Sequence, residues 1–435
     1  MVLGWAKVAE TNARAASAER QVAEAERRAA KAEAEAASER ALNEVSEPLM
    51  LTAKLLAFRQ HIETLEQNAR DRFKKARETW KLVVVRDRLV ANVLESFSSP
   101  QHLALMWRRT YVTYVGEEGE DAGGLTADLH ASFWREVLQP EHGIFERLTE
   151  GGAHLPRSDA DGDALRRVGR MLLKSVLDDH PTGPALSSFV LEFICGAHEA
   201  RAFRMERPRD ALRLLAACDA DLAQSWTAML NASSADFAAF GLTLDCFDDS
   251  LPAEPLAATN VGRAVVAGCR RKLLVDRHAA LVALREGFTL EGRLDLGVQL
   301  AQHSNTDLSL LLQGKPTLSA QDLLDCFDWS DPCCAAVTYL RELLQDAGAF
   351  DATRRQLLLR WCTGRNVLPV SGLGSKVTFA AADVPQNEVS DGRLPEASTC
   401  FHEVRLPSNL SKDMLRARLD QALDEFALQG GFGRQ

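Results

Sequence analysis

Two Leu-Pro steps near the end of the chain confine the backbone between them, at Leu394-Pro395 and Leu406-Pro407. Proline fixes φ and biases the residue before it towards an extended conformation. Residues 403–406 then alternate between charged and apolar side chains, which is the period-two pattern of a half-buried strand. The segment therefore predicts a defined loop that runs into a short strand, and Cys400 stands where the loop becomes the strand.

A cysteine at the mouth of such a loop can be reached by a large partner, so Cys400 is a candidate nucleophile. The alternative is a packing role, because free cysteine is among the most buried residue types. The chain has nine cysteines and no C-x-x-C pair, a pattern that predicts neither a disulfide framework nor a zinc site. Reduced thiols in a reducing compartment are therefore expected.

The length and charge of the chain limit the classes of protein to which it can belong. Its 435 residues are enough for two or three domains with sizeable cores. The formal net charge of −10 does not favour a nucleic-acid partner, whose binding site would be basic. No apolar run approaches the ~18 residues of a membrane span, and the first residues lack the apolar core of a signal peptide. We expect an intracellular protein of the cytoplasm, with the nucleus as the alternative.

The first 80 residues have a helical composition. Residues 8–45 are dominated by Ala, Glu and Arg and contain no Gly or Pro, which predicts a helix. A heptad repeat runs through this segment, but its seam is mostly alanine and would bury little area against a partner, so a solvated single helix is favoured over a coiled coil. A second helix, which has an apolar face, is expected at about 52–80.

The middle of the chain predicts a strand followed by amphipathic helices. Alternating aromatic and β-branched residues at 111–115 predict the strand, and Gly123-Gly124 predicts a turn before a helix that begins near Thr126. Acidic side chains crowd this turn and would repel a phosphate, so a structural role is favoured for its glycines. Apolar patterning also predicts a short strand at 242–247 and helices at 165–177, 189–195, 212–230, 260–288 and 336–344. A last helix is expected between Ser411, a plausible N-cap, and Gly430-Gly431.

Several motifs together resemble one known family. The segment LPEASTCFHEVRLP, residues 394–407, is similar to the active-cysteine segment of HECT ubiquitin ligases, which reads LP-x-(S/A)-x-T-C-F-x-x-L-x-L-P. Residues 116–124 resemble the family's G-E-x-G-x-D-x-G-G string. Further matches follow in the family's order; they lie at 81–89, 168–175, 283–288, 308–314 and 356–374.

The resemblance implies an α+β fold with a larger, mostly helical N-lobe and a smaller α/β C-lobe. It places a helical extension at 1–80, the N-lobe at 81–328 and the C-lobe with the cysteine at 329–435. Residues of about 200–265 would form the subdomain that docks the ubiquitin-conjugating enzyme. The proline-closed segment Asp328-Trp329-Ser330-Asp331-Pro332 is the candidate hinge between the lobes.

The resemblance also implies the chemistry. Cys400 would take ubiquitin from a conjugating enzyme as a thioester and pass it to lysines of protein substrates, without a metal or other cofactor. Thr399 and Phe401 would support the cysteine, and Phe432 stands where the family keeps an aromatic residue that assists transfer to lysine. An alternative for Phe432 is packing on the lobe.

Two other functions remain open at this stage. One is a HECT-like scaffold that binds ubiquitin or the conjugating enzyme but transfers nothing, and the other is a cysteine hydrolase, for which no partner histidine is marked. Ser398 departs from the histidine that many relatives have two places before the cysteine, which predicts slower chemistry. His402 is not expected to replace it, because residues two apart on a strand lie some ~6–7 Å from each other.

Overall fold

The computed structural model describes residues 53–68, 79–98, 106–117, 120–196, 205–294, 296–300, 303–346, 348, 350–382, 393–408 and 410–428. The predicted helix at 8–45 and Phe432 lie outside these ranges. The chain divides into two units, residues 1–57 and 58–435, and every contact given below lies within the second unit. None of the helices in the described ranges has both the length and the apolar character needed to span a bilayer.

The first sheet is a parallel pair of strands. β1 (Trp80–Val84) pairs with β2 (Thr110–Tyr114), from Trp80 opposite Thr110 to Val84 opposite Tyr114. The helix predicted at about 52–80 is therefore wrong at its end, because Trp80 begins a strand. After β2, the chain turns at Gly123, whose φ of 128° is a conformation that L side chains rarely adopt, and enters α3 (Gly124–Glu136) as predicted.

The largest helical contact joins α4 (Gly162–Leu177) to α10 (His278–Phe288). A glycine on each helix makes the crossing close: a Cβ at Gly169 would collide with the backbone of Leu284, and one at Gly287 with the backbone of Arg166. The predicted helix at 165–177 is confirmed. The helix predicted at 260–288 is interrupted by a π-helical turn, Arg271–Val275, between α9 (Val261–Arg270) and α10.

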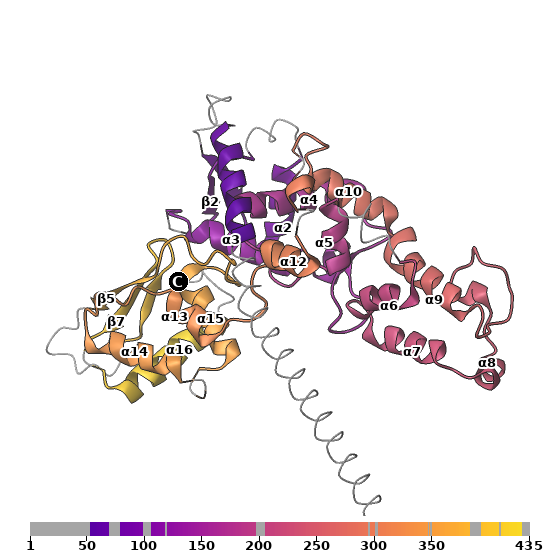
Figure 1. Cartoon of the computed structure of the whole chain (residues 1–435). Coiled ribbons are helices and arrows are strands. Elements are labelled where there is room, and N and C mark those ends of the chain that lie inside the picture. Colours follow the sequence, from indigo (N-terminus) through magenta and orange to yellow (C-terminus); the bar gives the residue numbers. More distant parts are fainter. Residues whose placement is uncertain are drawn as a thin grey trace, which may run out of the picture. The chain divides into compact units, whose positions relative to one another are not determined.

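A group of short helices precedes α9 in the chain (Figure 1). The segment predicted as one helix at 212–230 forms two, α6 (Pro208–Ala216) and α7 (Ala220–Leu230), which pack side by side. The predicted strand at 242–247 is wrong, because Leu244–Cys246 is a 3₁₀ turn. Leu244 is buried, and the neighbouring Thr243 pairs with Pro255 in an isolated bridge that belongs to no sheet.

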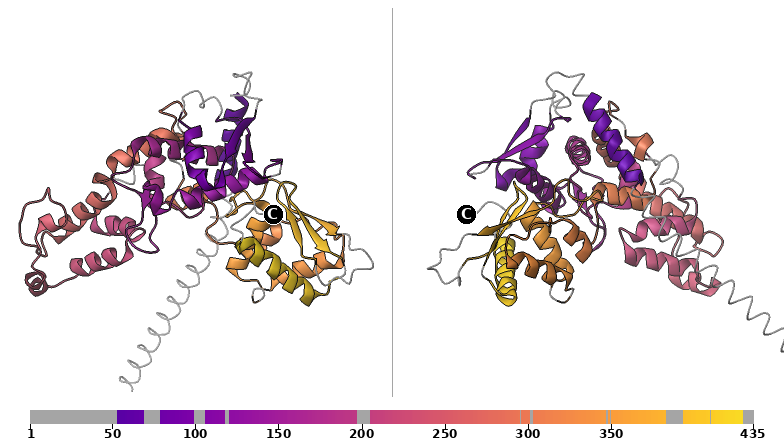
Figure 2. Two further views of the ribbon diagram at one scale, coloured as in Figure 1. Left: turned by 180° about the vertical axis from the view of Figure 1, so that it is seen from behind. Right: turned by 60° about the vertical axis from the view of Figure 1, so that its left-hand side comes forward.

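The C-terminal part has its own hydrophobic core, which runs from Leu318 to Phe426. Its sheet has the order β5-β7-β6, with β5 (Thr378–Ala382) parallel and β6 (Glu396–Ser398) antiparallel to β7 (Glu403–Pro407). Helices α13, α14, α15 and α16 complete it, as the orange and yellow elements of Figures 1 and 2 show. The predicted α+β class is confirmed; these helices are Ala320–Asp325, Ala335–Gln345, Ala352–Thr363 and Lys412–Leu428.

The predicted connector at 328–332 is tied to this C-terminal core. The backbone amide of Asp328 donates to the carbonyl of Val377 at 2.8 Å, and the Trp329 ring lies 5.1 Å from that of Phe379 on β5. The C-terminal core also includes Leu318, so residues that precede the connector in the chain already pack into this core. The remaining elements are α2 (Leu89–Ser96), β3 (Phe145–Glu146), β4 (Leu155–Pro156), α5 (Ser188–Ile194), α8 (Ser234–Phe240), α11 (Gly297–Leu300), α12 (Asn305–Gln313) and 3₁₀ turns at Arg86–Arg88 and Pro140–His142.

Candidate active site

Cys400 lies at the tip of a tight hairpin. β6 and β7 pair up to Ser398 opposite Glu403, so only residues 399–402 form the turn. The amide of Phe401 donates to the carbonyl of Ser398 at 3.2 Å, and His402 has a φ of 48°, in the left-handed region that closes such turns. The predicted strand after the cysteine is confirmed. The predicted loop before it is partly wrong, because residues 396–398 are themselves a strand.

The residues on either side of Cys400 face different surroundings. Thr399 is buried, Cys400 is half-buried, and Phe401 has 75% of its surface exposed. Single exposed aromatic side chains are common on protein surfaces, so Phe401 shows that the outer side of the hairpin is open to solvent. Cys400, next to it, is itself partly exposed.

The β2–α3 loop lies against the cysteine hairpin. The Cys400 Sγ atom is 3.4 Å from the carbonyl oxygen of Glu120 and donates to it. A Cβ added to Gly124 would lie 2.5 Å from Thr399 Oγ1 and 2.9 Å from the amide nitrogen of Cys400. The two motifs that the sequence presented separately, residues 116–124 and 394–407, therefore meet in space.

Asp121 holds the β2–α3 loop in shape from beneath. Its buried carboxylate accepts hydrogen bonds from the amides of Val112 and Gly123, each at 2.8 Å, and from the Thr126 hydroxyl at 2.6 Å. Such charge-assisted bonds are stronger than neutral ones. The aspartate of the motif is thus a structural anchor that joins strand, turn and helix.

Arg86 holds the other end of the same loop. Its guanidinium forms two hydrogen bonds with the Glu117 carboxylate, at 2.7 and 3.0 Å, and one with Asp128 on α3 at 2.5 Å. It also lies over the Tyr114 ring, 3.5 Å from the centroid. The sequence analysis included Arg86 in the matching segment 81–89 but gave it no role; its position directly after an apolar run was the available signal.

His402 is engaged with another residue. Its Nδ1 is 2.7 Å from Ser375 Oγ, and burial lowers its pKa, although a hydrogen bond to the carbonyl oxygen of Ser375 acts in the opposite direction. Burial thus favours the neutral imidazole. No hydrogen bond joins it to Cys400 in the described hairpin, and Ser398 ends β6.

The buried cysteines are less suited to nucleophilic chemistry. Burial raises the pKa of the Cys218 thiol to about 11 and that of Cys326 to about 12, so these thiols stay protonated. Cys246 and Cys333 are the exposed cysteines. The pKa of the Cys333 thiol is raised by the part of it that is shielded from solvent and by the adjacent Cys334 thiol. None of the nine cysteines, all of which lie within the described ranges, forms a disulfide. Among the described residues, no group of three or more His, Cys, Asp or Glu side chains is placed to hold a metal ion.

A second cluster of titratable side chains is buried beside α4. The Lys174 ammonium donates to the carbonyl of Arg108 at 2.6 Å and to Asp178 Oδ1 at 2.7 Å. The His130 ring stacks on that of His180 with 4.5 Å between centroids. Burial by itself would raise the pKa of Asp178, but the Lys174 charge and His130 bring it below its ordinary value. This cluster stabilises the fold and lies outside the cysteine hairpin.

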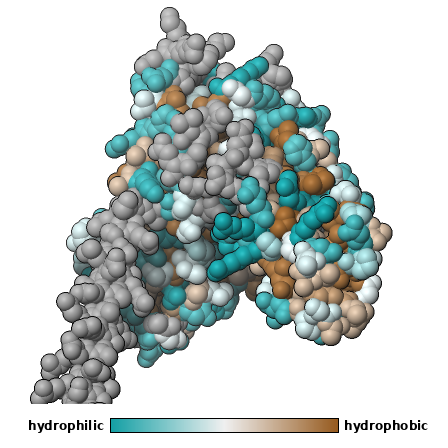
Figure 3. All heavy atoms as spheres, turned by 45° about the vertical axis from the view of Figure 1, so that its right-hand side comes forward, coloured by the Kyte–Doolittle hydropathy of each residue, from teal (hydrophilic) through white to brown (hydrophobic). Residues whose placement is uncertain are grey.

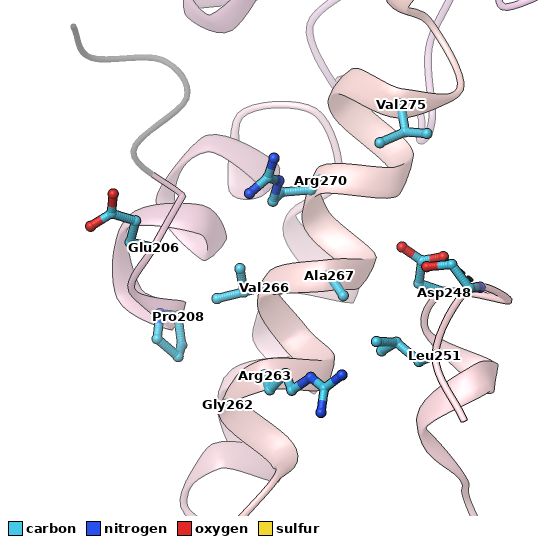
Figure 4. Close-up of a pocket in the computed structure, with 11 residues that line it drawn as sticks. Glu206, Pro208, Asp248, Leu251, Gly262, Arg263, Val266, Ala267, Arg270 and Val275 are labelled. Carbon is cyan, nitrogen blue, oxygen red and sulfur yellow. Dashed lines mark hydrogen bonds between the residues drawn. The ribbon is translucent and has the colours of Figure 1, made fainter. Parts of the chain in front are cut away.

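The region expected to dock a conjugating enzyme contains a cavity of about 670 Å³. In Figure 4, α9 presents Arg263, Val266 and Arg270 to it, between Pro208 on one side and Leu251 on the other. Arg263 and Arg270 are exposed, and the floor between them is apolar. Hydrophobic residues also gather in patches on the right-hand side of the face drawn in Figure 3. Such surfaces are typical of protein-binding sites.

Comparisons with known proteins agree on a single family. The model of the HECT-domain (ubiquitin-transferase) matches residues 131–433, a range that includes Cys400. The chain is 25% identical over 398 residues to the mouse E3 ubiquitin-protein ligase HUWE1, which covers 86% of this chain and 8% of the relative. It is 24% identical over 349 residues to the Drosophila melanogaster E3 ubiquitin-protein ligase Smurf1, covering 74% of this chain and 31% of the relative.

A shorter and more similar match joins the chain to the Saccharomyces cerevisiae Ubiquitin fusion degradation protein 4, with 33% identity over 91 residues, 20% of this chain and 6% of the relative. The chain thus spans less than a third of the length of each of these relatives. The family model, in contrast, covers more than half of the chain. The chain belongs to the HECT-domain family of ubiquitin transferases.

Proposed function

We propose that this chain is the catalytic part of a ubiquitin-protein ligase in which Cys400 carries ubiquitin as a thioester and passes it to substrate lysines. The observation that supports this most is the position of Cys400, half-buried at the tip of a hairpin beside the exposed Phe401. A large thioester-linked partner can approach such a thiol without any unfolding. Membership of the family supplies the reaction class.

Two transfers make up the proposed reaction. The Cys400 thiolate attacks the thioester that joins ubiquitin to the conjugating enzyme, and the enzyme's thiolate leaves. A lysine nitrogen then attacks the new thioester, an amide bond forms and the Cys400 sulfur leaves. Exchange between a thiol and a thioester is close to isoenergetic, so positioning of the two sulfurs is the main contribution of the protein.

The proposed docking site for the conjugating enzyme lies in α6–α9. Its support is the cavity beside Val266, with the exposed Arg263 and Arg270 at its rim. We also propose that the chain divides into an N-lobe and a C-lobe. The connection between the lobes would precede Leu318, where the C-terminal core begins. We also propose an intracellular location, which is consistent with nine cysteines that form no disulfide within the described ranges.

A single-turnover assay tests the proposed transfer to Cys400. The purified chain is mixed with conjugating enzymes already charged with ubiquitin, and products are separated without reductant. We expect a reductant-sensitive adduct that Cys400→Ala abolishes and that Cys246→Ala and Cys333→Ala leave intact. These two controls remove the thiols classed as exposed. Absence of the adduct with every conjugating enzyme, from folded protein, would favour the scaffold function instead.

A second arm of the assay tests the proposed docking site. Val266→Asp places a charge in the apolar floor of the cavity and is expected to slow charging of Cys400 at least tenfold, with saturation shifted to higher conjugating-enzyme concentration. Val83→Asp is the matched control, because Val83 is 62% exposed on β1. Equal charging rates for the two variants would show that the cavity is not part of the docking surface.

A further inference from the structure

Glu120 is the residue whose backbone touches the Cys400 thiol, and it falls on a variable position of the G-E-x-G-x-D-x-G-G string. We propose that its carboxylate binds the ammonium group of the acceptor lysine and takes up the proton which that nitrogen releases on attack. This inference rests on the proposed function and names a further catalytic residue for its second step.

The position of Glu120 follows from contacts that fix its backbone. Its carbonyl oxygen accepts from the uncharged Cys400 thiol at 3.4 Å, and from the amide of Ala122 at 3.1 Å, a bond that does not depend on the state of the sulfur. The buried Asp121 next to it holds the loop to β2 and α3. The Glu120 carboxylate is therefore carried by a backbone that lies directly beside the sulfur.

The carboxylate of Glu120 is also available for a ligand. The residue is exposed, and within the described part of the chain its carboxylate makes no hydrogen bond or ion pair. The neighbouring acids are already engaged: Glu117 pairs with Arg86, and Asp121 accepts backbone amides. On the hairpin side, Glu403 pairs with Arg405 at 2.8 Å. Of these acids beside the thiol, Glu120 is the one whose charge is left for an incoming cation.

The chemistry of the second transfer gives that charge a task. A lysine side chain arrives as an ammonium ion, since its ordinary pKa is ~10.4. As it becomes an amide nitrogen it gives up two protons, while the C–N bond forms and the C–S bond breaks. One proton restores the Cys400 thiol, and the other passes to the Glu120 carboxylate and then to water. A carboxylate at this point attracts the ammonium before attack and accepts the proton afterwards.

The test separates the two transfers. Wild-type protein and Glu120→Gln are first charged with ubiquitin on Cys400, the conjugating enzyme is removed, and equal amounts of charged protein are mixed with free lysine or with hydroxylamine. Hydroxylamine attacks the same thioester but is largely uncharged at neutral pH. Glu120→Asp tests rescue by a shorter carboxylate, and Glu141→Gln is the control, an exposed glutamate in the 3₁₀ turn Pro140–His142.

We expect Glu120→Gln to slow discharge onto lysine by about three- to fivefold, the upper part of the range for one exposed pair of opposite charges. Discharge onto hydroxylamine should change less than about twofold, and added salt should narrow the lysine difference, because it screens the attraction. Glu120→Asp should recover much of the lysine rate, and Glu141→Gln should match the wild type.

Two results would overturn the inference: equal discharge onto lysine by wild type and Glu120→Gln, or an equal loss with lysine and hydroxylamine, which would indicate a displaced loop. Failure of the wild-type protein to become charged would instead contradict the proposed function itself. That failure is seen in the first stage, before Glu120 is compared, so the two cannot be confused.

Discussion

Gly124, at the start of α3, lies directly against Thr399, although the two residues are far apart in the chain. A Cβ on Gly124 would stand 2.5 Å from Thr399 Oγ1, a distance that Cβ contacts essentially never show. Gly124 does not have a positive φ, so it is the space beside the cysteine hairpin, and not its backbone conformation, that requires glycine here.

Gly124→Ala should therefore push the β2–α3 loop away from the cysteine hairpin. Overlaps of this kind cost about 1–3 kcal/mol when they are not relieved, and separation of the two loops relieves this one. We expect alkylation of Cys400 by iodoacetamide, followed by mass spectrometry of its peptide, to become several-fold faster. Gly374→Ala is the control, because a Cβ there meets nothing within 4 Å. An unchanged rate would mean that the contact does not protect the thiol.

Asp121→Asn should destabilise the whole domain. The amide that replaces the carboxylate would point its own hydrogens at some of the buried donors, which include the amides of Val112 and Gly123. Buried donors left without partners cost about 1–3 kcal/mol each, so we expect a loss of about 3 kcal/mol in the free energy of unfolding. Urea denaturation measures it, with the exposed Asp159→Asn as the control. Equal midpoints for both variants would contradict this role.

Lys174→Met should be costly in the same assay. The change leaves the Asp178 carboxylate without the Lys174 ammonium that lies 2.7 Å away. Breaking a buried ion pair by removal of one partner typically costs about 3–5 kcal/mol. The double variant Lys174→Met with Asp178→Asn removes the stranded charge and should be more stable than Lys174→Met alone. If the loss in free energy of unfolding of the double variant equals the sum of the losses of Lys174→Met and Asp178→Asn, the two residues do not stabilise each other.

Stability should fall as the solution is acidified below pH 7. Burial lowers the pKa of His130 and lowers that of His180 further, with Arg365 acting in the same direction on both. The unfolded chain therefore binds these protons near pH 6.5 and the folded chain only at lower pH, so unfolding becomes easier as pH drops from 6.5. The expected slope is about 1.4 kcal/mol per pH unit for each histidine kept neutral.

Urea midpoints at pH 7.5, 6.5 and 5.5 measure this slope. His180→Phe keeps a ring beside His130 and removes one titrating group, so its slope should be smaller. Burial also lowers the pKa of His154 and His402, which leaves part of the slope in that variant. Greater stability at pH 5.5 than at pH 7.5 would contradict the assignment.

Local patterns predicted the elements whose burial follows a simple period. The helix at 165–177 and the strand after Cys400 both repeat their apolar residues at the spacing of the structure they form. β1 was missed because a parallel strand is defined by its partner, β2, which lies well beyond any local window. The turn at Leu244–Cys246 shows the opposite error, since its short alternating pattern has no neighbouring strand to pair with.

The site could be predicted only in part for a similar reason. Cys400 is marked by its own neighbours in the chain. Its contact with Glu120 spans 280 residues and leaves no local signal. The role of Arg86 likewise depends on where Glu117 and Asp128 arrive after folding. Motif spacing predicted that these segments matter, and the tertiary structure is needed to say which atoms meet.

The most direct test of the central claim uses Cys400→Ser with a charged conjugating enzyme. A serine in this place would take ubiquitin as an oxygen ester, which resists thiol reductants and is cleaved by mild alkali. We predict such an adduct, located by mass spectrometry on the peptide of residues 394–405. An adduct located on another cysteine in the wild-type protein, with residue 400 unmodified in both, would contradict the assignment of Cys400 as the nucleophile.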